Sequence, residues 1–251
     1  ITDEVALTGL KVGNEYTVKG VLMDKSTGEE LKVNDESITA EETFIADAAD
    51  MTITLTYTLD AKTLAGNTTV VFETLYTEGK EVGRHHEIDD EDQTVYIPEI
   101  HTTAADQKTG INHPESEEQA TIVDAVLYSH LLLGKEYTVK GTLMNKETGE
   151  VILINGEEVT AETTFTAEKS EGSVDVIFTF DASAIAPTSV VAFEHLEYKG
   201  IEIAVHADIE DKDQTVYVPK IKTTAIGEDT KEHIEKAKED AVIVDTVEYK
   251  G

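Results

Sequence analysis

The chain repeats itself with a period of 121 residues and without a gap. The string EYTVKG occurs at residues 15–20 and again at 136–141, and DQTVY occurs at 92–96 and again at 213–217. Both pairs are offset by 121 residues, which is the length of a whole domain and not of one solenoid turn. We therefore expect one fold to be built twice, with residues 243–251 belonging to the start of a third copy.

Within each period the apolar residues alternate with other residues, as they do in half-buried strands. Val174, Val176, Phe178 and Phe180 are separated by single residues, and turn dipeptides such as Asn-Gly and Thr-Gly punctuate the chain at short intervals. Two helix-like stretches, 181–186 and 231–240, are too short or too polar to form a core helix. The pattern predicts an all-β fold of antiparallel sandwiches. The residues expected in the core of the complete domain are Tyr137, Val139, Leu143, Phe165, Val176, Phe178, Val191 and Phe193.

Two prolines indicate where the domains meet. Pro98 and Pro219 each close a last strand, and each is followed by a Thr-Thr pair that opens the next domain. We expect tandem immunoglobulin-like repeats: 1–99 lacking its first strand, 100–220 complete, and 221–251 the start of a third repeat. On this interpretation the chain is a window of a longer array, and the anchoring and targeting signals lie outside it.

The strong acidity of the chain excludes several classes of partner. It has 20 Lys and Arg against 52 Asp and Glu, a formal net charge of −32, which is the wrong sign for binding nucleic acid or an anionic membrane. It has no cysteine, so a disulfide, a thiolate metal site and a cysteine nucleophile are all excluded. No apolar run approaches the roughly 18 residues of a membrane span, so we expect no membrane insertion.

Five side chains of the central repeat form a candidate site: Thr102, Asp124, Glu194, His206 and Gln214. Of these, Glu194 is the most informative, because it follows the apolar run 190–193, where a carboxylate is costly unless it is paired. The same exception occurs one period earlier, at Glu73.

Short motifs that recur in each period carry a resemblance to a known family. They are TTA at 102–104 and 223–225, VDxV at 123–126 and 244–247, [VA]FE at 71–73 and 192–194, and H-x7-Q at 85–93 and 206–214. In this combination the whole chain resembles the VaFE-type repeats of Gram-positive surface adhesins, which are immunoglobulin-like domains similar to the ester-bond domains of clostridial adhesins.

The resemblance implies a covalent ester between the Thr102 hydroxyl and the Gln214 carboxamide, formed with loss of ammonia. It implies that His206 is the general base or proton shuttle and that Asp124 and Glu194 share one proton. Two carboxyls held close together cannot both ionise, and a protonated carboxyl can donate a hydrogen bond to the amide oxygen. The reaction occurs once per domain, so we expect self-processing and not an enzyme with an external substrate.

The outer repeats contain only parts of this set. Asp3, Glu73 and His85 are the first-repeat counterparts of Asp124, Glu194 and His206. The half-sites are Gln93, whose Thr would precede residue 1, and Thr223 with Asp245, whose Gln would follow residue 251. Their partners lie either in a longer chain or in a neighbouring molecule, which would give a head-to-tail covalent fibre.

The resulting function hypothesis is a rigid stalk segment of an extracellular, cell-wall-anchored adhesin or fibre, with neighbouring repeats as its partners. A ligand-binding adhesin module is the alternative, although the gapless repeats argue against specialised binding loops. A Lys-Asn isopeptide bond would need a lysine in place of Thr102. We expect no cofactor and no metal, because the acidic runs 87–93 and 207–214 lack the glycine and glutamate spacing of an EF-hand and the histidines share no ligand spacing.

Overall fold

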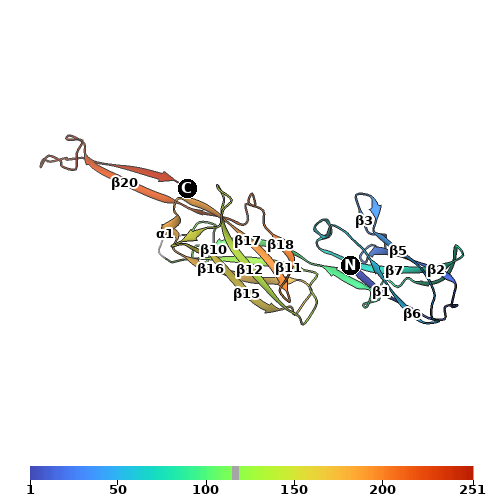
Figure 1. The fold of residues 1–251 in the computed structure, drawn as a ribbon. Helices are drawn as coiled ribbons and strands as arrows, with labels where there is room; N and C mark the ends of the chain where they lie inside the picture. The colour runs from blue at the N-terminus through green and yellow to red at the C-terminus, as the bar shows by residue number, and fades with distance from the viewer. Residues whose placement is uncertain (115–118, 251) are drawn as a thin grey trace. The chain divides into compact units, whose positions relative to one another are not determined.

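The computed structural model describes residues 1–114 and 119–250. In these residues the chain is built from antiparallel strands, with one 3-10 helix, η1 (Ala61–Leu64), and one short α-helix, α1 (Ala182–Ile185). Residues 231–240 form no helix. The all-β fold expected from the period-two pattern is therefore confirmed (Figure 1). By its internal contacts the chain divides into two units: the first holds Ile1–Glu99 together with Tyr128–Leu133 and Glu168–Glu171, and the second holds the remainder.

The complete repeat is an immunoglobulin-like sandwich of two sheets. One sheet has three strands in the order β10 (Glu99–Asp106), β11 (Ala120–Ser129) and β16 (Gly172–Phe180). The other runs β15 (Thr160–Thr166), β12 (Glu136–Asn145), β17 (Thr188–Tyr198) and β18 (Ile201–His206), with β19 (Thr215–Val218) also pairing with β17. A small hairpin of β13 (Leu153–Ile154) and β14 (Glu157–Glu158) completes this repeat.

One detail of the larger sheet positions the site. Strands β18 and β19 pair with successive parts of the same edge of β17, because β18 ends with His206 opposite Glu194 and β19 begins with Thr215 opposite Val191. The chain therefore leaves the sheet for the short acidic loop 207–214 and returns at the middle of β17. This brings Gln214, the last residue of the loop, back beside Glu194.

The first repeat has the same strands except one. Its larger sheet contains β5 (Thr39–Ile45), β2 (Glu15–Asp24), β7 (Asn67–Thr77), β8 (Lys80–His85) and β9 (Thr94–Ile97), with a small hairpin of β3 (Lys32–Val33) and β4 (Glu36–Ser37). Its smaller sheet has only β1 (Thr2–Leu7) and β6 (Met51–Thr56). In the complete repeat, β11 has β10 on one side and β16 on the other. In the first repeat, β1 pairs with β6, and no strand within residues 1–114 and 119–250 pairs with the other edge of β1.

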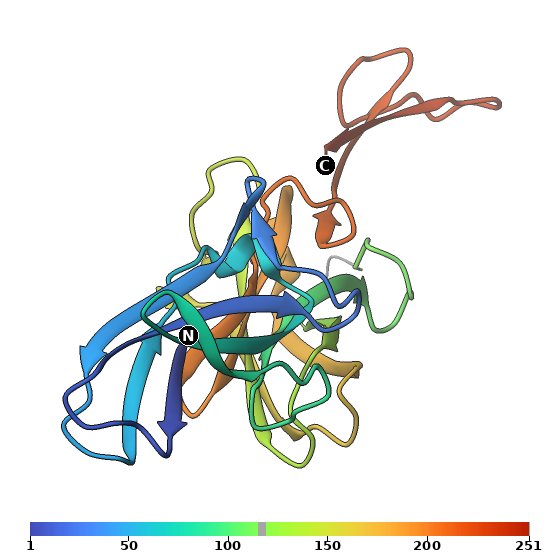
Figure 2. The same cartoon turned by 90° about the vertical axis from the view of Figure 1, so that its right-hand side faces the viewer.

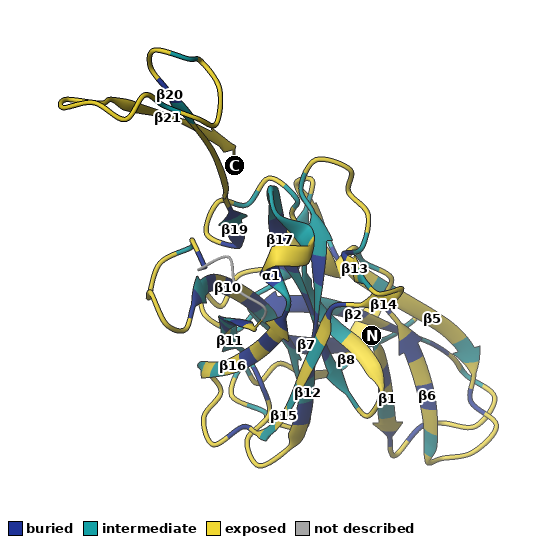
Figure 3. Cartoon of the chain, turned by 90° about the vertical axis from the view of Figure 1, so that its left-hand side faces the viewer, coloured by how far each residue is buried: buried dark blue, intermediate teal, exposed yellow. Residues whose placement is uncertain are grey.

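The third segment is a two-stranded hairpin of β20 (Lys220–Gly227) and β21 (Ile243–Lys250). These strands correspond to β10 and β11 one period earlier. Figure 2 shows them as two paired strands, and Figure 3 shows the hairpin almost wholly in the colour of exposed residues. The hairpin thus has strand structure without a core of its own.

The core lies between the two sheets of each repeat. Val176 and Phe178 on β16 and Leu143 on β12 are fully buried. Gly141 is required where the sheets approach, because a Cβ there would lie 2.4 Å from the Phe178 ring. Six of the eight expected core residues are buried, but Phe165 and Phe193 are only partly buried. For Phe193 the reason is alternation: its neighbour Glu194 occupies the inward position, so Phe193 points to the outer face.

No helix in the described part of the chain has the length and apolar character that a membrane span requires.

Candidate cross-linking site

The five side chains singled out from the sequence converge in the complete repeat. Thr102 lies on β10, Asp124 on β11, Glu194 on β17 and His206 at the end of β18, while Gln214 directly precedes β19. Strand alternation turns the first three inward, and Thr102 is 4% exposed while Asp124, Glu194 and Gln214 are completely buried. The site is therefore part of the sandwich core and not a surface cleft.

The Thr102 hydroxyl and the Gln214 amide are in direct contact. Gln214 Nε2 donates a hydrogen bond to Thr102 Oγ1, although the two residues are 112 positions apart in the sequence. The same Nε2 lies 2.5 Å from Glu194 Oε2, and Thr102 Oγ1 donates to that oxygen at 3.3 Å. One carboxyl oxygen of Glu194 thus contacts both the hydroxyl and the amide nitrogen.

We expected a protonated carboxyl to donate to the amide oxygen, and the structure shows a different arrangement. Glu194 faces the amide nitrogen of Gln214, while Gln214 Oε1 is buried and has no hydrogen-bond partner among the described residues. The carboxyl is therefore placed beside the group that leaves, and not beside the oxygen that gains charge.

The two buried carboxyls must hold a proton between them. Both oxygens of Asp124 and Oε1 of Glu194 lack a conventional donor among the described residues, which is costly for ionised groups. Burial, the hydrogen bond with Asp124 and the charge of Asp124 together raise the pKa of Glu194 to about 11. Burial also raises the pKa of Asp124. A proton on the pair removes the repulsion and supplies the missing donor.

His206 is held by acceptors on both sides of its ring. Nδ1 lies 3.3 Å from the Ile100 carbonyl oxygen and Nε2 lies 2.8 Å from Asp211 Oδ2. Because both partners are acceptors, only the doubly protonated ring satisfies both contacts. Within the described chain His206 makes no hydrogen bond to Thr102 or Gln214, and its charge instead lowers the pKa of the neighbouring Asp124.

Asp211 is a site residue that the sequence reasoning missed. Its Oδ2 accepts from His206, and its Oδ1 accepts from the backbone N–H groups of Asp213 and Gln214 at 2.8 and 3.4 Å. Burial raises the pKa of Asp211, but the hydrogen bonds from His206 and the two backbone groups outweigh burial and lower it. One carboxylate therefore fixes both the histidine and the loop that carries Gln214. An aspartate recurs at this place one period earlier, as Asp90, but Asp213 recurs in the same way as Asp92, so the repeat alone does not single out Asp211.

The first repeat assembles the same set without a threonine. Asp3 and Glu73 are buried, and burial, the charge of Asp3 and a hydrogen bond with Asp3 together raise the pKa of Glu73 to about 8. The His85 ring lies 3.6 Å from Glu73 and 3.1 Å from Asp90. The Gln93 side-chain oxygen is buried and has no partner among the described residues.

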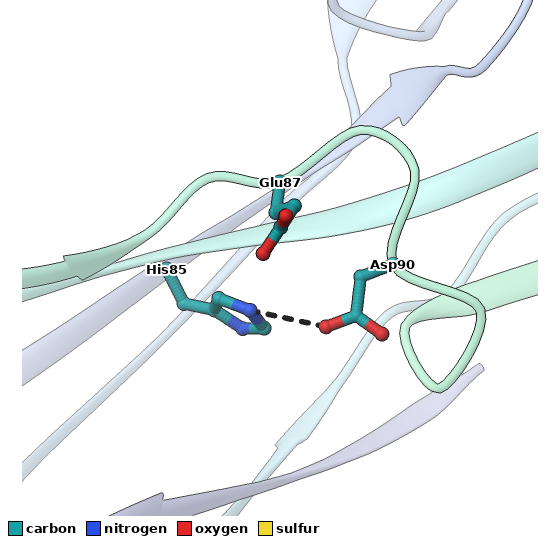
Figure 4. A group of neighbouring side chains, drawn as sticks. All are labelled: His85, Glu87 and Asp90. Atoms are coloured by element: carbon teal, nitrogen blue, oxygen red, sulfur yellow. Dashed lines mark ion pairs between the residues drawn. The ribbon is translucent and has the colours of Figure 1, made fainter.

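Figure 4 shows His85 with Asp90 and the neighbouring Glu87 in the acidic loop. The potential ligand atoms of these three residues lie within 4.8 Å of one another. His85 and Glu87 are exposed, however, and His85 already pairs with Asp90 and Glu73. The contact of His85 with Asp90 matches that of His206 with Asp211 in the complete repeat, so we interpret the cluster as part of the first-repeat counterpart of the site.

The β20–β21 hairpin carries the other half of the site, the counterparts of Thr102 and Asp124. Thr223 on β20 and Asp245 on β21 are both exposed. In the β20–β21 register Asp245 stands opposite Ala225, two positions along the strand from Thr223. Both residues therefore lie on the same face of the hairpin, as Thr102 and Asp124 do in the complete repeat.

Comparison with solved structures gives distant likenesses. A bacterial adhesin from Mobiluncus mulieris containing intramolecular disulfide, isopeptide and ester bond cross-links is 14% identical, with a TM-score of 0.38 over 61% of this chain and 75% of that chain. A structure described as BspA_C_WT is 13% identical, with a TM-score of 0.42 over 86% of this chain and 91% of that one. No curated protein sequence matches the chain.

The family comparison is more direct. The model of the T-Q ester bond containing domain matches residues 1–97, 98–218 and 219–251, which together cover the whole chain. These three matches follow the 121-residue period seen in the sequence. The chain belongs to the family of T-Q ester bond containing domains.

Proposed function

We propose that the chain is a structural stalk segment of a cell-surface adhesin or fibre, and that its complete repeat closes itself with an ester between Thr102 and Gln214. The observation that carries this proposal is the contact of the Gln214 amide with the Thr102 hydroxyl in a buried, acidic pocket. The family match and the likeness to a cross-linked adhesin agree with it.

The shared oxygen of Glu194 suggests how the protons move. Thr102 Oγ attacks the Gln214 side-chain carbonyl carbon, and the hydroxyl proton passes to Glu194 Oε2, the oxygen to which it already points. The same oxygen then gives that proton to the amide nitrogen, which leaves as ammonia. The C–O bond formed replaces the C–N bond broken, and the carboxyl pair ends with the protons it began with.

On this scheme Glu194 is the proton relay: the proton that the carboxyl pair shares lies on Asp124 when Glu194 Oε2 accepts from Thr102, and the raised pKa of Glu194 makes its ionised form a strong base. His206 lies beside Asp124, and the charge of its protonated ring lowers the pKa of Asp124, which opposes uptake of a second proton by the carboxyl pair. The assignment of His206 as base, which the family resemblance implied, is thus moved to Glu194.

The position of the site in the core favours rapid ester formation and protects the ester from hydrolysis. The hydroxyl and the amide are held together by the fold, so the reaction is intramolecular and benefits from a high effective concentration. Burial of all the reacting groups excludes the water that would hydrolyse the ester. The reaction stops after one turnover, so the repeat is a self-processing module and not an enzyme acting on other molecules.

The proposed bond suits a tether. It joins β10, the first strand of the repeat, to the residue before β19, the last strand, so tension along the chain would pass through the ester and not through the strand ladder. In the chain-entropy model, closing a loop of 112 residues restricts the unfolded state by about 5 kcal/mol. In a protein without cysteine on the outer face of a cell wall, such a link would stabilise the fold as a disulfide does in other proteins.

Intact mass spectrometry under denaturing conditions tests this function. The chain should weigh less than its sequence by one ammonia, and Thr102→Ala should restore the full mass. Thr103→Ala is the matched control, because Thr103 is the exposed neighbour on the same strand and should leave the mass deficit intact. A full sequence mass for the unmodified chain would refute the proposed ester.

A further inference from the structure

The acidic loop that carries Gln214 has to be held in place by contacts from outside the loop. Between the end of β18 and the start of β19 the chain leaves the edge of β17 for residues 207–214. The loop sequence, ADIEDKDQ, contains four carboxylates and one lysine. Like charges at this spacing repel one another, and ordering the loop costs backbone entropy. A contact that fixes the loop therefore bears directly on whether Gln214 stays beside Thr102.

The Lys146 side chain enters this loop from the turn that follows β12. Its Nζ atom donates a hydrogen bond to the Ile209 carbonyl oxygen at 3.0 Å and another to Thr215 Oγ1 at 3.1 Å. The Lys146 side chain is 23% exposed, and Thr215 is completely buried. One ammonium group thus spans the segment that contains both Asp211 and Gln214.

Thr215 extends this contact to the residue that holds His206. Its hydroxyl oxygen accepts from Lys146, and its hydroxyl proton is donated to the Asp211 backbone carbonyl oxygen. The Asp211 side chain in turn accepts from His206 and from the backbone N–H of Asp213. Hydrogen bonds that involve an ionised group are stronger than those between neutral groups. A series of hydrogen bonds therefore runs from the ammonium group to the histidine of the site.

The backbone of Lys146 is fixed to the strand that carries Glu194. The Lys146 backbone N–H donates to the Ser189 carbonyl oxygen on β17 at 2.9 Å. The preceding residue, Asn145, is the last residue of β12, and its side-chain oxygen accepts from two backbone N–H groups of the turn at 2.9 and 3.2 Å. Lys146 thus connects the strand of Glu194 to the loop of Gln214 through a single side chain.

The first repeat contains the same contact. Lys25 directly follows β2, its backbone N–H donates to the Thr68 carbonyl oxygen on β7, and its Nζ donates to Thr94 Oγ1 at 3.1 Å. Thr94 Oγ1 donates to the Asp90 carbonyl oxygen at 2.6 Å. Because Thr94 directly follows Gln93, a lysine holds the residue next to the glutamine in both repeats.

The contacts of Lys146 differ from those of a lysine in a surface ion pair. Glu210 Oε2 lies 3.9 Å from Nζ, and the Glu210 side chain is 80% exposed, so this pair contributes little. The shorter contacts, to the Ile209 carbonyl oxygen and the Thr215 hydroxyl, are partly buried. Lys146 therefore acts mainly on neutral oxygens, whose positions it fixes.

We propose that Lys146 is a positioning residue for ester formation, whose ammonium group holds the loop so that the Gln214 amide stays against the Thr102 hydroxyl. The proposal rests on the ester chemistry proposed above. No hydrogen bond joins Lys146 to a reacting atom in the described part of the chain, so it acts through Ile209 and Thr215. Misplacing reacting groups by about 1 Å can slow a reaction about a hundred-fold, so a modest shift of the loop is enough to matter.

The rate of ester formation during refolding tests this role. The chain is recovered from inclusion bodies in denaturant, and a full sequence mass at time zero confirms that no ester is present. Dilution starts folding, which circular dichroism follows, while intact mass measures the loss of ammonia over time. Comparing the two signals separates the rate of the chemical step from the rate of folding.

Lys146→Met keeps the unbranched apolar stem of the side chain and removes the ammonium group. We expect the folded variant to lose ammonia about ten-fold to a hundred-fold more slowly than the unmodified chain. Lys140→Met is the matched control, because it makes the same change on β12 at a lysine whose ion pair with Glu197 lies at the surface. Equal rates for the two variants would overturn the proposal.

Two further variants test whether hydrogen-bond donation is the cause. Lys146→Arg keeps the charge and the donors, so it should recover most of the rate that Lys146→Met loses, and an equally slow arginine variant would contradict the proposal. Thr215→Val keeps the shape of the side chain and removes the hydroxyl, so it should also slow the reaction, and it provides the comparison if Lys146→Met does not fold. Combined with Lys146→Met it should slow the reaction by less than the product of the two single effects, whereas a full product would mean that the two residues act independently.

A chain that cannot react separates positioning from stability. Thr102→Val forms no ester, and the Gln214 side-chain amide then gives ¹⁵N–¹H signals that depend on its surroundings and are identified by their loss in Gln214→Met. In this background Lys146→Met should shift the signals, and Lys140→Met should leave them in place. Unshifted signals together with a lower unfolding midpoint would show that Lys146 only stabilises the fold, which would overturn the positioning role.

The unmodified chain distinguishes failure of this proposal from failure of the proposed function. If it folds and never loses ammonia, the ester is refuted, and the role of Lys146 in forming it is refuted too. If it loses one ammonia and Lys146→Met does so at the same rate, the positioning role is refuted and the Thr102–Gln214 ester stands.

Discussion

Glu194 stands directly opposite His206 in the antiparallel register of β17 and β18, and its Oε2 atom contacts both Thr102 and Gln214. One side chain therefore touches the hydroxyl that loses a proton and the nitrogen that gains one. The histidine is turned toward Asp211 and the Ile100 carbonyl group. In the reaction that we propose, this geometry lets the Glu194 carboxyl move the proton, while the His206 ring faces away from the reacting atoms.

The first prediction concerns Glu194→Gln. The amide is close in size to the protonated carboxyl but cannot accept the Thr102 proton and pass it on, so the ester should not form. The variant should keep the full sequence mass while folding to the same β-rich structure by circular dichroism. Glu162→Gln, at an exposed position on β15, is the control and should cross-link normally. Complete ester formation by Glu194→Gln would exclude the relay.

The second prediction concerns Asp211→Asn. Asparagine keeps an oxygen for the backbone N–H groups of Asp213 and Gln214 but loses the charge that holds the His206 ring. We expect cross-linking to slow while the loop stays in place, which freshly purified protein followed by mass spectrometry over time would show. Asp208→Asn is the control, because Asp208 caps a turn of the same loop without contacting His206. If both variants cross-link at the same rate, the charge of Asp211 has no role.

The third prediction concerns the stability that the ester provides. Thr102→Val keeps the branched shape of the side chain and removes the nucleophile, so the second unit should lose about 5 kcal/mol of unfolding free energy from loop closure alone. Denaturant titration followed by circular dichroism measures this loss. Thr103→Val, at the exposed neighbouring position, should leave the unfolding midpoint of that unit nearly unchanged. Equal midpoints for the two variants would show that the ester adds no stability.

Much of this site could be predicted from the sequence because the same residue pattern occurs in two successive repeats. The 121-residue offset pairs Glu73 with Glu194, and a carboxyl that interrupts the same apolar strand in two repeats indicates a buried role. Strand alternation then predicts which side chains face the core. The convergence of Thr102 and Gln214 came from the family resemblance, because no local pattern specifies a contact across 112 residues.

Other features could not be read in this way. Asp211 lies in a run of acidic residues, and its composition gives no sign that this one carboxylate is turned inward to His206. Phe193 looks like a core residue by its type, but the inward position belongs to its neighbour Glu194. The orientation of the Gln214 amide depends on tertiary contacts alone. The sequence could therefore not predict that the amide nitrogen, and not the oxygen, faces Glu194.

The fourth prediction concerns the pH dependence of the first unit, in which Gln93 has no threonine partner among the described residues. The pKa of Glu73 is about 8 in the folded state against an ordinary value of 4.5. The folded unit therefore holds a proton that the unfolded chain has lost between these values, so stability falls as pH rises from about 4.5 to about 8 and then levels off.

Calorimetry of the intact chain measures this dependence as the midpoint of the lower-melting transition, which we assign to the unit without an ester. Glu73→Gln should flatten its pH dependence between pH 5 and 8. Glu42→Gln, at an exposed position on β5, should not. A transition that is independent of pH in the unmodified chain would mean that Glu73 is ionised throughout.

The last prediction concerns Tyr57 and Phe178, which occupy the same position one period apart. Tyr57 is 2% exposed and its hydroxyl has no hydrogen-bond partner among the described residues. Burial raises the pKa of Tyr57, and the charges of Asp3 and Glu73 raise it further, so the hydroxyl lies close to the carboxyl pair of the first unit. The complete repeat, which has Phe178 there, buries no such group.

Because an unpaired buried hydroxyl costs about 1 to 3 kcal/mol, Tyr57→Phe should raise the melting temperature of the first unit. The reciprocal change, Phe178→Tyr, should place a hydroxyl beside Asp124 and Glu194 and slow ester formation, as intact mass measured over time would show. Leu127→Phe, at an exposed position on β11, is a control for a change of side-chain size outside the core. If Tyr57→Phe instead lowers the melting temperature by several degrees, the hydroxyl donates to Asp3 or Glu73 and belongs to the first-repeat site itself.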